Sequence, residues 1–178
     1  AMPTGRQAGN AMPKTCKPTA GRVEVCNAKY GRNGWLGIAS VWANGSHIAQ
    51  GTVKLNDTYY NTATYNTPAW RNLVMCQEVG HTFGLDHQDE NFSNLNLGTC
   101  MDYTNSPESN QHPNLHDYEM LETIYAHLDT TTTVAALSAA DQPEVDTDDP
   151  KNWGQEIRRS KDGRASLYER DFGGGRKV

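Results

Sequence analysis

We expect the fold to be organised around one continuous segment, Cys76-Gln77-Glu78-Val79-Gly80-His81-Thr82-Phe83-Gly84-Leu85-Asp86-His87. Residues four positions apart share a face of an α-helix, so Gln77 and His81 point in the same direction, with Glu78 one step around the helix. Gly84 can adopt the left-handed conformation that often ends a helix. The chain can then turn and bring His87 back towards His81, so that two imidazoles meet at one point.

This segment resembles the long zinc signature of the metzincin metallopeptidases, HExxHxxGxxH, at every diagnostic position except the first, where Gln77 stands. Downstream, Cys100-Met101-Asp102-Tyr103 resembles the Met-turn of the same family, in which a methionine lies beneath the metal. The pattern QExxHxxGxxH is also similar to that of some secreted, matrixin-like bacterial peptidases, which would make Gln77 a native ligand. The resemblance covers residues 22–128.

The resemblance implies a zinc-dependent endopeptidase whose metal ligands are Gln77, His81 and His87. It implies that Glu78 is the general base, which takes a proton from the attacking water and passes it to the leaving amine. Tyr103 would approach the metal or donate its hydroxyl group to the developing oxyanion. Because a neutral amide is a weaker donor than imidazole, we expect Gln77 to lower the affinity for zinc.

An alternative from another class is a catalytically silent, metzincin-shaped module that binds peptides along an edge strand. Its zinc binding would be weak or absent because Gln77 replaces a histidine. The presence of Glu78 favours the enzyme, since a silent relative has little chemical need for that carboxylate. A third interpretation is that His81 and His87 are structural histidines and that Glu78 is merely solvated.

Other polar residues near the segment have two interpretations each. Asp86 and Asp89 either hydrogen-bond a ligand histidine or lie at the surface. The remaining histidines are expected at the surface or at helix caps, although His112 or His116 could close over the cleft.

The four cysteines, Cys16, Cys26, Cys76 and Cys100, allow three pairings. We favour Cys16 with Cys26 and Cys76 with Cys100. The second bond would fasten the ligand-bearing helix to the Met-turn, because Cys100 directly precedes Met101. Two free buried thiols in a cytosolic protein are the alternative. We expect the disulfides and therefore a secreted, extracellular protein.

We predict an α+β fold of zincin or metzincin type, with a small twisted sheet, an active-site helix, the Met-turn and a C-terminal helix. The usual upstream strand and long helix have no counterpart, so the upper subdomain is expected to be truncated or reduced. Strands are expected over residues 22–27, 35–42 and 52–56, with a tight turn at Asn44-Gly45. Helices are expected from a Thr67-Pro68 start to about Phe83, and from Pro113-Asn114 to about His127, with irregular segments over 57–66 and 88–113. The strand before the Asn44-Gly45 turn is either the exposed edge that binds an extended substrate or an ordinary covered edge.

Composition predicts four parts: a loose lead-in over residues 1–20, a catalytic domain over 21–129, an acidic flexible linker over 130–150 and a basic tail or truncated module over 151–178. The net charge is -5, and the linker carries five acidic residues, so charge indicates no nucleic-acid partner. No apolar run approaches the roughly 20 residues of a membrane span, so no membrane partner is expected. We expect a monomer that binds a protein or peptide substrate in extended conformation. Zinc is the expected cofactor, and calcium is possible but not indicated.

Overall fold

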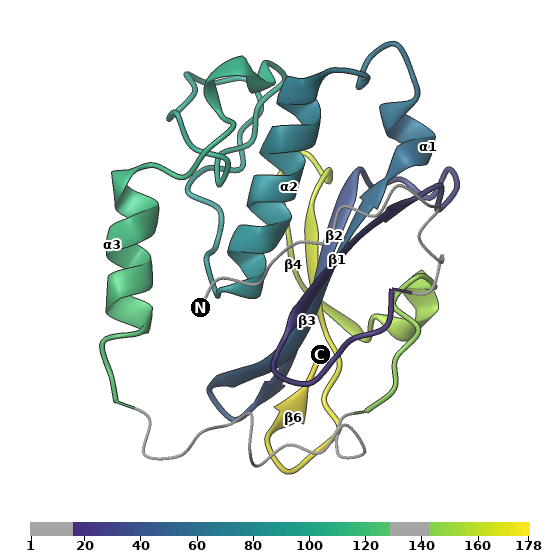
Figure 1. The fold of residues 1–178 in the computed structure, drawn as a ribbon, viewed down its shortest axis with the longest axis vertical. Helices are drawn as coiled ribbons and strands as arrows, with labels where there is room; N and C mark the ends of the chain where they lie inside the picture. The colour runs from purple at the N-terminus through teal and green to yellow at the C-terminus, as the bar shows by residue number, and fades with distance from the viewer. Residues whose placement is uncertain (1–15, 129–142) are drawn as a thin grey trace.

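A mixed sheet of four strands, with helix α2 (Pro68–Thr82) packed against it, forms the centre of the computed structural model, which describes residues 16–128 and 143–178 (Figure 1). The strands are β1 (Val23–Ala28), β2 (Gly37–Asn44), β3 (His47–Asn56) and β6 (Arg176–Lys177), in the order β1-β3-β2-β6. β1 runs parallel to β3, whereas β2 is antiparallel to both of its neighbours. This arrangement confirms the α+β prediction and the three expected strand positions.

Helix α2 begins and ends where its sequence predicts. The Thr67 hydroxyl accepts a hydrogen bond from the backbone N–H of Trp70 at 3.3 Å, and Pro68 occupies the first turn, where a missing N–H is tolerated. Beyond the last turn, Gly84 has a positive φ of 90°. Leu73 and Val74 are buried in the core between α2 and the sheet. This packing fixes the position of α2, and therefore of Gln77 and His81, relative to the sheet.

Strand β3 is longer than expected, because the prediction covered only residues 52–56. The missed part lies at the centre of the sheet between β1 and β2. Residues 49–54 are all buried, so the strand lacks the alternation of apolar and polar residues by which half-buried strands are recognised. The predicted turn is present, and Gly45 supplies its positive φ of 61° between paired Asn44 and His47.

The segment 57–66, predicted to be a surface loop, contains the short helix α1 (Asp57–Tyr60) instead. Asn56 caps this helix, and Tyr60 is completely buried against Leu73 and Val74. Its abundant polar residues suggested exposure, whereas the buried ring of Tyr60 and the ion pair of Asp57 with Arg71 hold the segment against α2.

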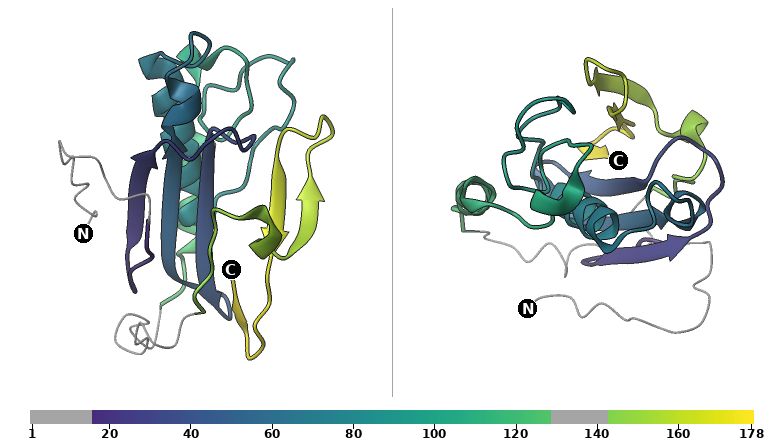
Figure 2. Two further views of the ribbon diagram at one scale, coloured as in Figure 1. Left: turned by 90° about the vertical axis from the view of Figure 1, so that its right-hand side faces the viewer. Right: turned by 90° about the horizontal axis from the view of Figure 1, so that it is seen from above.

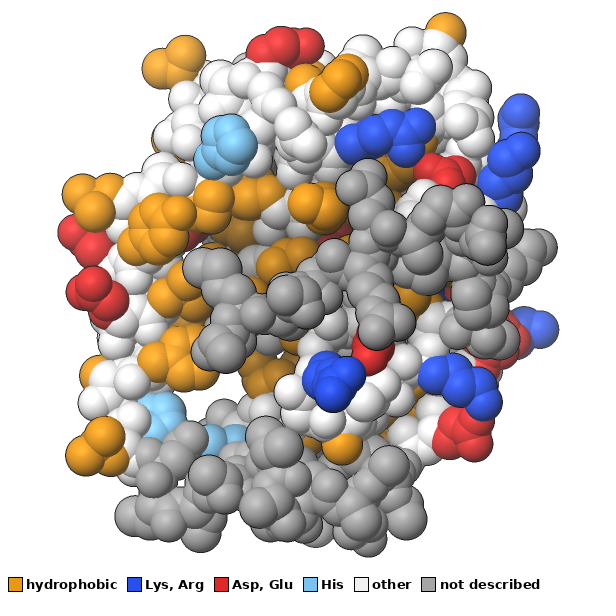
Figure 3. Space-filling model, in the orientation of Figure 1, with side chains coloured by type: hydrophobic (Ala, Val, Ile, Leu, Met, Phe, Trp, Pro, Cys, Tyr) orange, Lys and Arg blue, Asp and Glu red, His pale blue; other side chains and the backbone are white. Residues whose placement is uncertain are grey.

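Helix α3 (Leu115–Ile124) confirms the second predicted helix but ends before His127. Asn114 and Asp117 form a capping box at its start. Leu121 and Ile124 pack against the cluster around Leu85 and Met101. Large apolar side chains in α2 and α3, or directly after them, remain exposed; they include Met75, Phe83, Tyr118, Met120 and Tyr125. Figure 3 shows hydrophobic groups gathered on the face of the molecule that is turned to the viewer.

Residues 143–178 contact the sheet and form strands of their own beside it (Figure 2). Buried Lys54 of β3 bonds Thr147 at 2.9 Å and pairs with Asp148 at 2.5 Å. β6 pairs with the end of β2, and β4 (Gln155–Arg159) and β5 (Ser166–Glu169) form a separate hairpin. A buried ammonium group requires an anionic partner, and the acidic segment provides it.

Short 3₁₀ turns at Pro107–Ser109 (η1) and Pro150–Asn152 (η3) complete the described elements. None of the described helices is long and apolar enough to cross a membrane. Residues 1–15 of the predicted lead-in (1–20) and residues 130–142 of the predicted linker (130–150) lie outside the described residues, and the four-part domain division stays a prediction.

Candidate metal centre and catalytic groups

The centre of the candidate site is a pair of histidines. His81 lies on the last turn of α2, and His87 lies on the loop that follows Gly84. Their Nε2 atoms are 2.9 Å apart, and their ring planes are almost perpendicular. The predicted return of the chain at Gly84 therefore brings the two imidazoles together.

Hydrogen bonds determine which nitrogen of each ring carries the proton. His81 Nδ1 donates to the backbone oxygen of Leu85 at 2.8 Å, and His87 Nδ1 donates to Glu90 Oε1 at 3.2 Å. Because these oxygens can only accept, the Nε2 atom of each neutral ring has an unshared electron pair. Two such pairs at this distance repel each other, and a shared proton or metal ion would relieve the repulsion.

Both rings are neutral at pH 7. Burial, with a smaller contribution from the neighbouring His87, lowers the pKa of His81 to about 4. Burial likewise lowers the pKa of His87 to about 4, against the opposing effect of the Asp86 carboxylate. Since neutral imidazole is the form that binds metals, both rings are ready to act as ligands.

Gln77 supplies a third polar group on the same face of α2 as His81. Its side chain is 6% exposed, and its buried Nε2 atom has no hydrogen-bond partner in the described part of the chain. An unpaired buried amide group costs about 1–3 kcal/mol. The unpaired atom here is an N–H donor, whereas a metal ion would bind the amide oxygen of Gln77. Within residues 16–128 and 143–178 there is no group of three or more His, Cys, Asp or Glu side chains that could hold a metal ion. The two imidazoles and the Gln77 amide nevertheless make three candidate ligands, which is the number of protein ligands that a catalytic zinc ion takes.

Glu78 lies beneath strand β2. The backbone N–H of Ala39 donates to its carboxylate, while burial raises its pKa to about 8. Gly37 makes this approach feasible, because a Cβ atom there would lie 2.7 Å from Cγ of Glu78 and 2.5 Å from Cγ1 of Val74. Glu78 can therefore exchange a proton close to neutral pH.

The edge of β2 that faces away from β3 is mostly unpaired among the described strands. β6 pairs only with Ala43 and Asn44, so residues 37–42 have no strand neighbour on this side in the part of the chain that the structure describes. Ala39, which contacts Glu78, lies within this free edge. An extended peptide could pair here beside the candidate base.

The predicted Met-turn packs directly under α2. Met101 is completely buried, and its sulfur lies 2.6 Å from where a Cβ atom on Gly80 would be, so only glycine permits this approach. The disulfide between Cys76 and Cys100 joins the helix to the turn, with 5.8 Å between their Cα atoms. The Cys16–Cys26 bond is also present, so both predicted pairings are confirmed.

Tyr103 completes the group. Its ring centroid lies 4.3 Å from that of His87, and it stacks on Phe92 with centroids 4.7 Å apart. Burial raises the pKa of Tyr103, and the nearby charge of Glu78 raises it further, so the hydroxyl keeps its proton and can donate it in a hydrogen bond.

Glu90, which orients His87, was not predicted. Asp86 and Asp89 were considered for this role, but the Asp86 side chain accepts from the backbone N–H of His87, and Asp89 accepts from Asn91 and Asn94. The spacing of Glu90, three residues after His87, is the signal that could have identified it.

A second unpredicted group connects the His87 segment to the Met-turn. Asp117 of α3 is 1% exposed; it accepts from Gln88 Nε2 at 2.7 Å and forms a very short hydrogen bond with the Thr99 hydroxyl. Thr99 in turn accepts from the backbone N–H of Met101 at 3.0 Å. The sequence predicted a helix that starts at Pro113-Asn114, but it did not identify Asp117, whose carboxylate both caps α3 and binds the segments next to the site.

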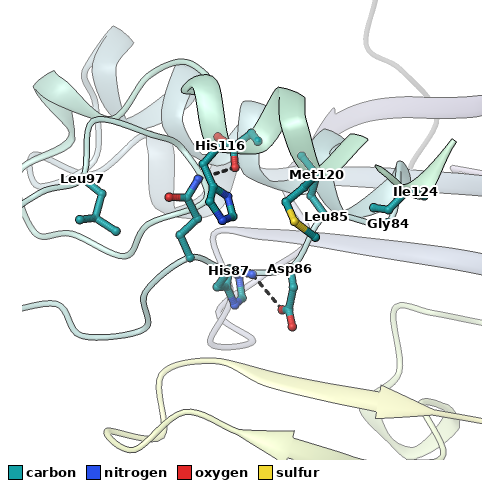
Figure 4. A pocket seen from close by; sticks show the side chains of 10 residues that line it. Gly84, Leu85, Asp86, His87, Leu97, His116, Met120 and Ile124 are labelled. Atoms are coloured by element: carbon teal, nitrogen blue, oxygen red, sulfur yellow. Dashed lines mark hydrogen bonds between the residues drawn. The ribbon is translucent and has the colours of Figure 1, made fainter. Parts of the chain in front are cut away.

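A pocket of about 330 Å³ lies between the 84–88 loop and α3. Figure 4 shows His116 and Met120 on one side of it and the loop on the other. His116, which was considered as a residue that could close over the cleft, lines this pocket. In the same view Asp86 and His87 extend from their loop towards the ribbon of the β4–β5 hairpin.

Comparison of the chain with protein-family models, with curated proteins and with solved structures found no match. The functional proposal therefore depends on the residues and distances of the site itself.

Proposed function

We propose that the protein is a secreted, zinc-dependent endopeptidase of metzincin type that hydrolyses peptide bonds in proteins. The observation that carries the proposal is the convergence of the two Nε2 atoms of His81 and His87, which are 2.9 Å apart. Gln77 lies one helical turn before His81 on the same face of α2. Glu78 and Tyr103 lie close enough to each other for the carboxylate charge to raise the tyrosine pKa. The two disulfides support a secreted protein, because such bonds persist in oxidising compartments.

In this proposal Gln77, His81 and His87 hold the zinc ion. Zinc bound there would supply Lewis acidity, lowering the pKa of water and polarising a substrate carbonyl group. Glu78 in its ionised form accepts the proton of the attacking water and returns it to the leaving amine. Burial raises the pKa of Glu78 to about 8, and the positive charge of a bound zinc ion would favour the ionised form.

The rest of the site positions the substrate. An extended peptide pairs with the free edge of β2, which places its backbone beside Glu78. The protonated hydroxyl of Tyr103 donates a hydrogen bond to the oxygen on which negative charge develops. Both roles use main-chain groups of the substrate, which is consistent with a peptidase that acts on proteins.

The second candidate function is a catalytically silent module that binds peptides along β2. Two observations favour it: the first ligand position holds Gln77, and the edge of β2 is free along residues 37–42 in the described structure. It differs from the enzyme in one measurable respect, because it binds peptides without cleaving them.

The test measures zinc and activity on one sample of the full chain. Elemental mass spectrometry gives the metal content, and an unfolded fluorogenic protein gives the cleavage rate with and without chelator. We expect near-stoichiometric zinc and chelator-sensitive cleavage. Glu78→Gln should reduce cleavage by a factor of roughly 10² or more while zinc stays bound, because general-base catalysis is lost and the ligands are untouched.

The matched control is Glu119→Gln on the exposed face of α3, which should cleave normally. Zinc without cleavage in the unaltered chain would favour the silent module. Absence of zinc would refute the proposed metal centre, and full activity of Glu78→Gln would refute the role of that carboxylate.

A further inference from the structure

The basic C-terminal hairpin contacts the loop that carries His87. Both terminal guanidinium nitrogens of Arg158, on β4, bond the two oxygens of the Asp86 carboxylate. The same guanidinium lies 3.6 Å from Glu90 Oε1, and that oxygen accepts from His87 Nδ1 at 3.2 Å. Arg158 is thus linked to His87 through Glu90, and it also binds Asp86, the residue directly before His87.

A second arginine of the hairpin holds the other part of the same loop. Arg164 lies over the ring of Phe92, 3.6 Å from its centroid, and bonds Asn105 at 3.1 Å. Phe92 stacks on Tyr103, which contacts His87. The hairpin therefore contacts the loop near His87 and near Tyr103.

The loop needs such contacts because it has almost no regular structure. Across residues 86–105 the only pairing of strand type is the isolated bridge between Asp89 and Asp102. Fixing one residue of an irregular chain costs about 1–2 kcal/mol of conformational entropy, which local contacts have to offset. A metal ligand on this loop depends on its neighbours for its orientation.

We infer that Arg158 is a positioning residue for His87: by holding Asp86 and Glu90, it fixes the imidazole in the orientation that binds the metal. This inference rests on the proposed zinc site. The charge of Arg158 alone would have the opposite effect, because a cation close to the site opposes a metal ion. The direction of the change in metal affinity therefore separates positioning from charge.

The test is the dissociation constant of cobalt(II), measured with the full chain and the variant Arg158→Lys. Lysine keeps the positive charge but cannot hold Asp86 with two parallel bonds while reaching Glu90. Measurement in 0.5 M salt, where the screening length is about 4 Å, suppresses the remaining charge effect. We expect affinity roughly 10-fold weaker, at the lower end of the 10–100-fold range for groups that orient metal ligands.

The visible absorption bands of cobalt(II) provide a second readout, because they report the ligand geometry. They should change in Arg158→Lys but not in the matched control Arg159→Lys, whose guanidinium bonds Glu156 within the hairpin. A further variant, Arg158→Met, removes both the positive charge and the two parallel hydrogen bonds to Asp86. It should also bind the metal more weakly than the unaltered chain. The unfolding midpoint of each metal-free variant checks that it folds.

Each other outcome contradicts a particular statement. If the unaltered chain binds cobalt(II) and Arg158→Lys binds it equally well or more tightly, the positioning role is wrong and the proposed function is unaffected. If peptide cleavage rises while metal affinity stays the same, the hairpin is a cover, which also overturns the inference. If the unaltered chain binds no metal, the proposed function and this inference are both refuted.

Discussion

The raised pKa of Glu78 predicts how the stability of the metal-free protein depends on pH. In the folded protein the pKa is about 8, against an ordinary value of 4.5. Between these values the folded state keeps a proton that the unfolded state releases, so stability falls as pH rises. His81 and His87 act in the opposite direction: their pKa values fall from 6.5 to about 4, so stability falls as pH drops below 6.5. These three groups together place the stability maximum near pH 6.5.

The magnitude follows from the width of the window. From pH 6.5 to pH 8, Glu78 alone lowers the free energy of unfolding by 1.5 pH units at 1.36 kcal/mol each, or about 2 kcal/mol. In Glu78→Gln the side chain no longer titrates, so this fall should disappear. The exposed control Glu119→Gln should keep it.

The assay is urea unfolding at pH 6.5 and pH 8.0, in the presence of a chelator, for the unaltered chain and both variants. For each protein the loss of stability between the two pH values is measured. The difference between the losses of the unaltered chain and a variant removes the titration of the groups that both proteins share. If Glu78→Gln loses as much stability as the unaltered chain over this interval, Glu78 is not buried in a protonated form and the reasoning is refuted.

Three further changes test other parts of the site. Replacing Cys76 and Cys100 together by serine should lower the free energy of unfolding by about 3.5 kcal/mol, since their bond closes a loop with a sequence separation of 24 residues; urea titration measures this, and a loss below about 1 kcal/mol would contradict it. Gly80→Ala should destabilise by about 1–3 kcal/mol, because the added Cβ atom would lie 2.6 Å from the sulfur of fully buried Met101; an unchanged thermal midpoint would mean that Met101 can move aside. Gln77→His should raise the affinity for zinc, since imidazole is the stronger donor; an equal or higher dissociation constant in calorimetric titration would count against Gln77 as a ligand.

Short-range interactions account for what could be predicted about the site. Thr67 and Pro68 start helix α2 through their own hydroxyl and ring, and Gly84 ends it through its own backbone freedom. Given that helix, the i and i+4 spacing places Gln77 and His81 on one face whatever the rest of the chain does. The approach of His87 could be predicted because it lies only a few residues beyond the turn.

The groups that surround these residues could not be predicted in the same way. The first part of strand β3 was not predicted because residues 49–54 are all buried, so the strand has no alternation of apolar and polar residues. Tyr60 is buried in a segment whose composition indicated a loop. Glu90 was overlooked because its role depends on the exact course of an irregular loop.

The sequence by itself determined the helix, its ends, the tight turn at Asn44-Gly45 and the order of the candidate ligands, since each depends on residues close together in the chain. Only the tertiary structure decided which carboxylate orients His87, that Arg158 holds it, and that the basic C-terminal segment belongs beside the site. Arg158 and Asp86 are 72 residues apart, and Lys54 and Asp148 are 94 apart. Contacts of that separation depend on how the whole sheet, loop and hairpin pack, and no local pattern of residues encodes them.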